Sequence, residues 1–301
     1  MTAIRNGAVA VGNFDGVHRG HAALMAELRS QARRVNGPAV AVTFDPHPIA
    51  LLAPERLQPL LTTIADRVEL LKAAGADAVV ILPTTRELLA LSPREFLDRV
   101  LGDQLAARAV VEGFNFRFGR DRAGSNDTLA TWCAERGMRL VIVPPWEWQG
   151  VTVSSSRVRS ALLAGDVGAA AELLGRPYRL RGAVGGGAKR GQSLGFPTAN
   201  LIDPQSLVPG DGVYAAHALL ADGSVQPAAV NVGPNPTFGD QARKVEAHLI
   251  GFQGDLYGQD LAIDFVKRLR DTRRFASADE LAEQLRADCL AATRSLRSEA
   301  R

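Results

Sequence analysis

Two histidines follow a glycine-rich turn near the start of the chain, in "AVAVGNFDGVHRGHAALM" (residues 8–25). The apolar run before the turn predicts a buried strand, and the stretch after it predicts a helix. The first turn of a helix carries unpaired backbone N–H groups and a partial positive charge, so it attracts anions. His18 and His21 are three residues apart and project from one face of that turn. As imidazolium groups they would neutralise charge on a phosphate under attack.

The turn itself predicts close contact between backbone and phosphate, because glycine lets a ligand approach the main chain. Its candidate phosphate-binding residues are Gly12, Phe14, Asp15 and Gly16. Two alternatives stay open for the histidines. They could bind a metal, although no third ligand is near in sequence, or they could be structural, one packing and one capping. The glycine turn between strand and helix favours phosphate.

A second candidate for phosphate binding is "SSSRVRSALLAGD" (residues 154–166). Its serines can cap a helix N-terminus, and the two arginines beside them can pair with phosphate oxygens. The residues are Ser154, Ser155, Ser156, Arg157 and Arg159. Alone, the pattern is typical of an ordinary capped helix with solvated arginines. Together with the histidine turn it predicts a two-sided phosphate clamp.

The second half of the chain has its own candidates, in "GGGAKRGQSLGFPTANL" (residues 185–201). It has no GK[ST] in the frame of a Walker A motif. Thr198 and Asn200 are two residues apart on an extended segment, so they face the same way and offer hard oxygen ligands for Mg²⁺ or phosphate. Glu246 stands among apolar residues and could accept a proton from an alcohol, or could be a solvent-face residue of an alternating strand. Asp264 ranks below it for the same role.

The elements that must position these residues fall into two patterns. Up to about Gly175, apolar strands alternate with helices, which predicts a doubly wound parallel sheet with ligands at the carboxyl ends of its strands. After it, short alternating strands and Gly/Pro turns predict an antiparallel barrel or sandwich closed by one helix, with Ser277 and Glu280 as a capping box. We therefore expect domains at residues 1–175 and 176–301. The predicted strands of the first are residues 8–14, 39–46, 76–83, 107–116 and 139–145.

Composition narrows the class of protein. The chain has 301 residues, 46% hydrophobic content and a net charge of +3, without a dense Lys/Arg run, so we expect no nucleic-acid partner. No stretch is long and apolar enough for a membrane span, and we expect no membrane partner. The two cysteines, Cys133 and Cys289, have no metal-site spacing and fit a reducing, cytoplasmic compartment. Protein partners are not predicted, and a weak homo-oligomer is left open.

The motif "GNFDGVHRGH" resembles the signature of the HxGH nucleotidylyltransferases. With its "FDG" it is similar to the adenylyltransferase half of bacterial bifunctional riboflavin kinase/FAD synthetases, and residues 154–166 match that family's second motif in the right order. The resemblance implies that the first domain adenylylates FMN, whose phosphate attacks the α-phosphate of ATP. It further implies that His18 and His21 hold ATP phosphates, with Arg157 and Arg159 on the other side.

Two further segments match this family. "TFDPHP" (residues 43–48) carries Asp45 and His47 at a strand end. "GFNFRFGRDRAG" (residues 113–124) carries Asn115 and three aromatics, Phe114, Phe116 and Phe118, which alternation would put on one face of an extended segment. An apolar, aromatic wall with polar groups at its edge suits a flavin ring. For at least one Phe we expect core packing instead.

The second half resembles the riboflavin kinases, because "GFPTANL" is similar to their signature and their fold is a small antiparallel barrel. The resemblance implies that Glu246 is the general base for the ribityl hydroxyl and that Thr198 and Asn200 bind Mg²⁺. It also implies that the Gly-rich segment holds ATP through Gly185, Lys189, Gly191 and Gly195. The chain departs from the family pattern at Asn235, where we expect Arg. It also begins almost at the first strand, where many members carry a short preceding segment.

The sequence therefore predicts two consecutive activities, riboflavin to FMN and FMN to FAD, both with ATP and Mg²⁺. The expected small-molecule partners are riboflavin, FMN, FAD and ATP. One alternative is a nucleotidylyltransferase with a non-catalytic flavin-binding barrel. The other is a flavin sensor or carrier, which would need neither the histidine turn nor the Ser/Arg clamp.

Overall fold

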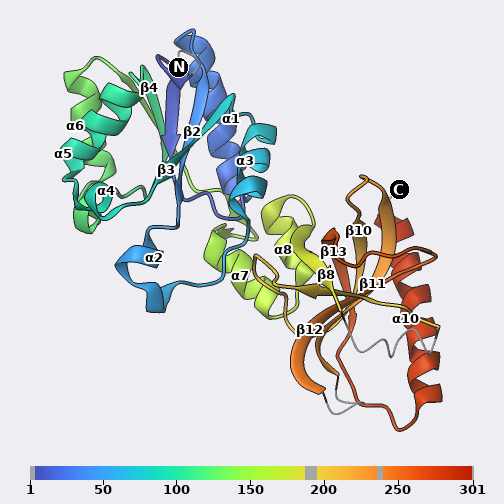
Figure 1. Ribbon diagram of the computed structural model, residues 1–301. Helices are drawn as coiled ribbons and strands as arrows, with labels where there is room; N and C mark the ends of the chain where they lie inside the picture. Colours follow the sequence, from blue (N-terminus) through green and yellow to red (C-terminus); the bar gives the residue numbers. More distant parts are fainter. Residues whose placement is uncertain (1–3, 187–194, 236–239, 300–301) are drawn as a thin grey trace. The chain divides into compact units, whose positions relative to one another are not determined.

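The computed structural model describes residues 4–186, 195–235 and 240–299 of the chain. They form two compact units (Figure 1). The first consists of Met1–Pro59 with Thr63–Ser154, and the second of Leu60–Thr62 with Ser155–Arg301.

The first unit is built on a five-stranded parallel sheet of order β3-β2-β1-β4-β5. The strand order reverses between β1 and β4, as in a doubly wound fold, so this part of the predicted fold class is confirmed. The strands are β1 (Ala8–Val11), β2 (Ala39–Asp45), β3 (Ala78–Pro83), β4 (Ala109–Gly113) and β5 (Arg139–Val143).

Helices cover both faces of this sheet, as Figure 1 shows. The helices α1 (Arg19–Arg34) and α3 (Ile64–Ala73) pack on one face, where the central strands present mostly alanines. The other face carries α5 (Pro93–Phe96), a π-helix (Leu97–Gln104) and α6 (Asn126–Glu135). There the same strands present valines. Side chains alternate along a strand, so each strand gives small residues to one layer and larger ones to the other.

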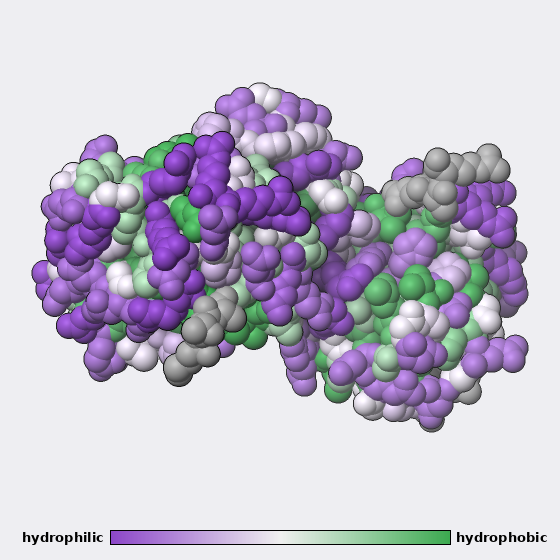
Figure 2. All heavy atoms as spheres, turned by 90° about the horizontal axis from the view of Figure 1, so that it is seen from above, coloured by the Kyte–Doolittle hydropathy of each residue, from purple (hydrophilic) through white to green (hydrophobic). Residues whose placement is uncertain are grey.

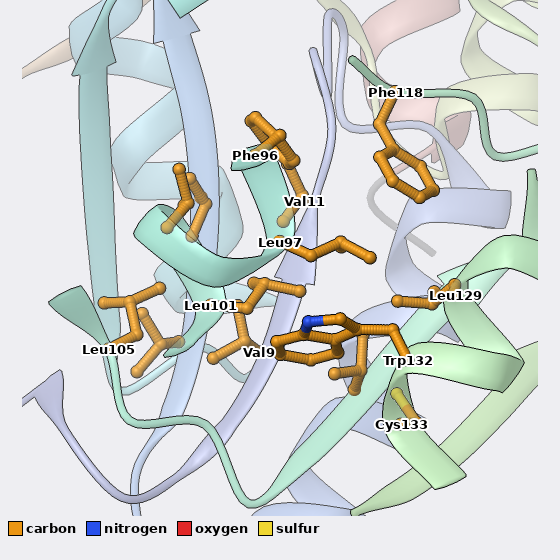
Figure 3. Packing of buried hydrophobic residues seen from close by; sticks show 14 of the residues in the cluster. Val9, Val11, Phe96, Leu97, Leu101, Leu105, Phe118, Leu129, Trp132 and Cys133 are labelled. Atoms are coloured by element: carbon orange, nitrogen blue, oxygen red, sulfur yellow. The ribbon is translucent and has the colours of Figure 1, made fainter. Parts of the chain in front are cut away.

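The valine face is the larger core of the unit (Figure 3). The indole of Trp132 is buried in it, and its Nε1 donates to Asp98 Oδ1 at 2.8 Å. Figure 3 shows Phe96 and Phe118 at one end of this cluster and Leu105 at the other. Phe96 and Phe118 also line a cavity.

Local signals set several element ends. Ser92 and Glu95 form a capping box at the start of α5, with Pro93 at the first helical position. Gly75 follows the C-cap of α3 with φ +121°. Short elements that the sequence did not predict join the longer ones. They are α2 (Ile49–Leu52), 3₁₀ turns at Pro54–Arg56 and Arg120–Arg122, α4 (Arg86–Ala90), β6 (Glu147–Trp148) and β7 (Val151–Thr152).

The second unit is a closed barrel of six strands in the order β10-β11-β12-β9-β8-β13, paired antiparallel throughout. This confirms the predicted barrel. Closure leaves no unpaired sheet edge in the barrel. Its strands are β8 (Tyr178–Gly185), β9 (Ala199–Ile202), β10 (Gly212–Leu219), β11 (Val225–Asn235), β12 (Asp240–Leu249) and β13 (Asp260–Arg270).

Within the described part of the chain, the barrel is accompanied by the helices α7 (Ser155–Leu163), α8 (Val167–Leu174) and α10 (Ala278–Glu299). Arg270 on β13 donates from Nε and Nη2 to the two carboxylate oxygens of buried Asp288 on α10, at 2.9 and 2.7 Å. The predicted cap of α10 is half right. The Ser277 hydroxyl accepts from the Glu280 N–H, but the Glu280 carboxylate accepts from Ala276 rather than from Ser277.

The surface in Figure 2 is mostly hydrophilic, with smaller hydrophobic areas. Among the helices of residues 4–186, 195–235 and 240–299, none is long and apolar enough to cross a membrane. Cys133 and Cys289 are free thiols, and burial raises the pKa of each to about 11. Both thiols are therefore unreactive packing groups near neutral pH.

Candidate active sites

The histidine turn lies where β1 ends and α1 begins. His18 is the N-cap of α1, and its Nδ1 accepts a hydrogen bond from the backbone N–H of His21 at 3.3 Å. The two imidazole rings are stacked, with centroids 3.7 Å apart and planes inclined by 15°. Gly16 has φ +83°, a conformation that favours glycine. The structure thus brings both predicted histidines together at a helix N-terminus.

His21 sits against protein on most sides. The Phe14 ring meets its edge at a centroid distance of 5.2 Å. Burial lowers the pKa of His21 well below its usual value, and the neighbouring His18 and Arg67 lower it further. Its Nδ1 is buried, and no hydrogen-bond partner for it is found within the described part of the chain. The sequence predicts an imidazolium at this position. His21 is instead a neutral ring near pH 7.

A buried ion pair lies beneath the turn. Arg67 of α3 is 3.5 Å from the Asp15 carboxylate, and both side chains are almost fully buried. The same guanidinium lies 3.4 Å from the hydroxyl of Thr43, which donates to the Asn13 carbonyl at 3.1 Å. Asp15 thus faces Arg67 as well as belonging to the predicted phosphate loop. This network holds the turn in position.

A cavity of about 550 Å³ opens beside the turn, within the size range of small-molecule sites. Its polar end includes Gly12, Asn13, His21 and Glu112. The rest is largely apolar and aromatic, with three arginines at its margin. These residues include Phe44, His47, Pro48, Ile49, Leu52, Arg56, Leu88, Phe96, Asn115, Phe116, Arg117, Phe118 and Arg122.

The predicted aromatic wall is present in part. Phe116 and Phe118 line the cavity and stack at a centroid distance of 5.1 Å. Phe114 does not share their face, because β4 ends at Gly113 and the chain turns there; its side chain is 47% exposed. His47 lines the cavity and its Nδ1 accepts from the Ile49 N–H at 3.2 Å. Asp45, at the end of β2, is exposed.

The predicted Ser/Arg side of the clamp lies mainly in the second unit. Ser154 ends the first unit, and α7 begins at Ser155. Arg157 and Arg159 are both partly buried on α7. Their role opposite the histidine turn stays a prediction.

In the barrel, strand register places the predicted base beside a predicted metal ligand. Glu246 on β12 is directly opposite Asn200 on β9 and, on its other side, opposite Asn231 on β11. Residues opposite one another in antiparallel strands share a face of the sheet. The flanking Val245 and Ala247 are buried in the barrel. The three polar side chains therefore form a row across three strands.

The other candidate residues of the barrel do not lie in this row of polar side chains. Thr198 precedes β9 and lines a second cavity, of about 310 Å³, together with Pro197, Leu249, Phe252 and Tyr257. Gly185 ends β8, opposite Asn200, and Gly195 has φ +83°. Lys189 and Gly191 lie outside the described residues. Asn235 ends β11.

Asp264, the lower-ranked candidate for the base, is paired with Arg179. Its two carboxylate oxygens accept from Nε and Nη2 of Arg179 at 2.6 and 2.7 Å. A substrate hydroxyl at this carboxylate would have to compete with the guanidinium for both oxygens. The choice between Glu246 and Asp264 as the base stays a prediction.

Three residues with a place in these sites were not among the predicted ones. They are Glu112, Arg67 and Asn231. Glu112 is 1% exposed, its Oε1 accepts from the Val11 N–H at 2.8 Å, and burial raises its pKa well above the usual range. In sequence it is one polar residue at a strand end. Only tertiary structure gives these residues their neighbours, through strand pairing for Glu112 and Asn231 and through the packing of α3 for Arg67.

The side chains of the two units differ in the metal ligands that they offer. Among the described residues, no group of three or more His, Cys, Asp and Glu is arranged to hold a metal ion. The barrel offers a different set, the oxygens of Thr198 and Asn200, with Glu246 opposite Asn200 on the neighbouring strand. Such hard oxygen donors suit Mg²⁺, which commonly completes its shell with substrate phosphates and water. The barrel residues therefore fit a magnesium ion that arrives with ATP.

Two different family models match two consecutive parts of the chain. Residues 1–157 match the model for FAD synthetase, and residues 174–296 match the model for riboflavin kinase. Together they cover most of the sequence. The histidine turn lies in the first match, and Thr198, Asn200 and Glu246 lie in the second.

Similar whole proteins carry both parts. A bifunctional riboflavin kinase/FMN adenylyltransferase of Pseudomonas fluorescens is 40% identical over 94% of this chain and 90% of its own length. One from Escherichia coli K12 is 34% identical over the same shares. A crystal structure described as a macrolide-efflux protein from Streptococcus pneumoniae has a TM-score of 0.84 at 32% identity, over 94% of this chain and 92% of that one.

Proposed function

Because the chain belongs to the family of bifunctional riboflavin kinases/FMN adenylyltransferases, we propose that it phosphorylates riboflavin to FMN and then adenylylates FMN to FAD. Each step consumes one ATP. The observation that carries the proposal is the pairing of two different sites on one chain. One has stacked imidazoles at a helix N-terminus, and the other has a carboxylate beside amide oxygens.

Adenylyl transfer belongs to the first unit. An oxygen of the FMN phosphate attacks the α-phosphorus of ATP, forming one P–O bond while the bond to pyrophosphate breaks. The nucleophile is already ionised near neutral pH, so this site needs no base. Since Nδ1 of His18 accepts a hydrogen bond, its neutral ring carries the proton on Nε2 and donates from there. His18, His21 and the N–H groups of α1 would stabilise charge on the phosphates.

The remaining predicted residues of this half are assigned as follows. Gly12, Phe14, Asp15 and Gly16 shape the phosphate loop, and Asp15 acts through Arg67. The flavin ring would lie against Phe116 and Phe118, with Asn115, His47 and Asp45 at its edge. The triphosphate oxygens would also bind the second motif, at Ser154, Ser155, Ser156, Arg157 and Arg159.

Riboflavin phosphorylation belongs to the barrel. Glu246 accepts the proton of the terminal ribityl hydroxyl. The hydroxyl oxygen attacks the γ-phosphorus of ATP, and ADP leaves. Thr198 and Asn200 would hold Mg²⁺, whose charge offsets that of the phosphates when it is bound. Gly185, Lys189, Gly191 and Gly195 would contact ATP. An alcohol must lose a proton and a phosphate need not, which accounts for a carboxylate base in the barrel alone.

We further propose functional domains at residues 1–175 and 176–301. On this assignment α7 and α8 serve adenylyl transfer, although they belong to the same compact unit as the barrel. The two free thiols and the need for ATP favour the cytoplasm as the place of action.

The test is a time course of the purified protein with riboflavin, ATP and Mg²⁺, with flavins separated by chromatography and a parallel reaction started from FMN. We expect FMN and then FAD from riboflavin, and FAD alone from FMN. FAD from FMN with unchanged riboflavin would instead support a non-catalytic flavin-binding barrel. Flavin binding without any turnover by a folded protein would reject the enzymatic proposal.

A further inference from the structure

A buried carboxyl group occupies the point where the strand order of the first unit reverses. The ladder between β1 and β4 pairs Ala8 with Ala109 and Val9 with Val110. Two residues further, the Val11 N–H donates to the side chain of Glu112, with 2.8 Å between N and Oε1. In open α/β sheets, ligands bind in the crevice at this reversal, beyond the carboxyl ends of the strands.

The surroundings of Glu112 put it in contact with that crevice. It lines the 550 Å³ cavity together with Gly12, Asn13 and His21, and Asn115 and Phe116, which also line it, follow Glu112 closely along the chain. Among the described residues, the Val11 N–H is its hydrogen-bond donor, and it uses Oε1. The second oxygen, Oε2, is left for a group in the cavity.

A purely structural role does not explain a carboxyl group here. A hydroxyl or amide oxygen could accept one backbone N–H, whereas a buried carboxyl group is costly to desolvate unless it is fully hydrogen-bonded. Burial raises the pKa of Glu112 well above the usual range, which favours the protonated form. A protonated carboxyl both donates and accepts, and a hydroxyl group of a ligand is its natural complement.

The shape of the substrates tells which hydroxyl could be there. On the proposed function, the FMN phosphate lies near the histidines and the ring lies at the aromatic end, so the ribityl chain passes Glu112. The ribose of ATP offers the same chemistry. We propose that Glu112 contacts substrate in the adenylyltransferase unit and hydrogen-bonds a hydroxyl group of a sugar-derived segment, either the ribityl chain of FMN or the ribose of ATP.

The experiment combines enzyme variants with substrates that each lack one hydroxyl. The substrates are FMN without its 2′-, 3′- or 4′-hydroxyl and ATP without its 2′- or 3′-hydroxyl. The variants are Glu112→Val, Glu112→Met and Glu112→Gln, with Glu69→Gln on the exposed side of α3 as the matched control. The readout is kcat/KM for FAD formation, with flavin fluorescence as an independent measure of FMN binding.

The wild-type enzyme and the control should prefer the complete substrate over one deoxy analogue by about 10- to 100-fold, as a hydrogen bond to a buried acidic group predicts. Glu112→Val should reduce that preference to less than about threefold. A preference lost for an FMN analogue assigns the contact to the ribityl chain, and one lost for an ATP analogue assigns it to the ribose.

Two results would overturn the proposal. One is a wild-type enzyme that distinguishes no deoxy analogue, and the other is Glu112→Val with the wild-type preference intact. If Glu112→Val does not fold, Glu112→Met decides, because it is close to Glu in length but offers no oxygen to a hydroxyl group. An unchanged preference in that variant also rejects the contact, whereas Glu112→Gln, whose NH₂ group still donates to a hydroxyl, should keep part of the preference. If no FAD forms at all, the proposed function fails, while the binding measurements still test Glu112.

Discussion

The rings of His18 and His21 are stacked 3.7 Å apart, and the first accepts a hydrogen bond from the backbone of the second. Two imidazolium charges at that separation would repel each other strongly in a buried setting. His21 is therefore held as a neutral ring, because burial, His18 and Arg67 all lower its pKa. This relationship makes the site sensitive both to substitution and to pH.

Replacing His21 by Ala should reduce FAD formation from FMN by about 10²- to 10³-fold, the usual effect of losing one donor to a developing charge. FMN formation from riboflavin should be unchanged, because the barrel has its own site. Initial rates of both reactions provide the measurement. His217→Ala, on β10 of the barrel, controls for loss of a histidine elsewhere and should leave FAD formation intact. Loss of both reactions in folded His21→Ala would refute the division of labour.

Acid should weaken the fold of the first unit through His21. Its pKa in the folded protein is lowered, so the unfolded chain takes up the proton first as the pH falls below about 6.5. The contribution of neutral His21 to the free energy of unfolding is complete above that pH. It is lost as the pH falls toward the pKa of His21 in the folded protein, by at most about 1.4 kcal/mol per pH unit. Denaturant unfolding of the wild-type protein and His21→Asn between pH 5 and 8 should show a difference that changes with pH. A constant difference would contradict this.

Glu246→Gln should lower riboflavin phosphorylation by about 10²- to 10⁴-fold and leave FAD formation from FMN intact. The amide keeps the size of the side chain but does not accept the proton. Asp264→Asn is the comparison, since Asp264 is bound by Arg179. It should keep most kinase activity and lower the free energy of unfolding by about 1 kcal/mol. The reverse pattern of activities would make Asp264 the base.

Arg67→Met should destabilise the first unit by about 3 kcal/mol, because it removes a buried positive charge from beside Asp15. FAD formation should fall as well, since the turn loses a support. Arg67→Lys keeps the charge and should recover part of both, and Lys72→Met, exposed on the same helix, should change neither. Thermal unfolding and the rate of FAD formation are the two measurements. Wild-type stability in Arg67→Met would show that the ion pair is dispensable.

Much of the fold is predictable because its signals are local. The central strands are apolar throughout, and the ends of α3 and α5 are set by Gly75 and Ser92 within one turn of each helix. The prediction failed at Phe114, where alternation was extended past the end of β4 at Gly113. Nothing in a run of alternating aromatics marks the residue at which the sheet stops.

The candidate sites are predictable only where their residues are neighbours in sequence. His18 and His21 are one helical turn apart, so their spacing alone predicts a shared face. Glu112 meets a partner 101 residues away, and Arg67 in an amphipathic helix is typical of a solvent-facing residue. Asn231 joins Glu246 through the register of the β11–β12 pair, which includes a shift between Gly233 and Asn235 that the residue types do not mark. Tertiary pairing, rather than residue type, decides such cases.

The alanine face of the sheet has a consequence for evolution. Ala10 and Ala41 contact no substrate in the proposed reaction, yet they and their neighbours determine how near α1 lies to the sheet and hence where its first turn stands. Close-packed interiors do not absorb extra methyl groups without displacement. Substitution by larger residues at these positions would move the histidines. It would lower the rate of FAD formation before it lowered the solubility of the protein. Selection on chemistry can therefore act on core residues that never touch the reacting atoms.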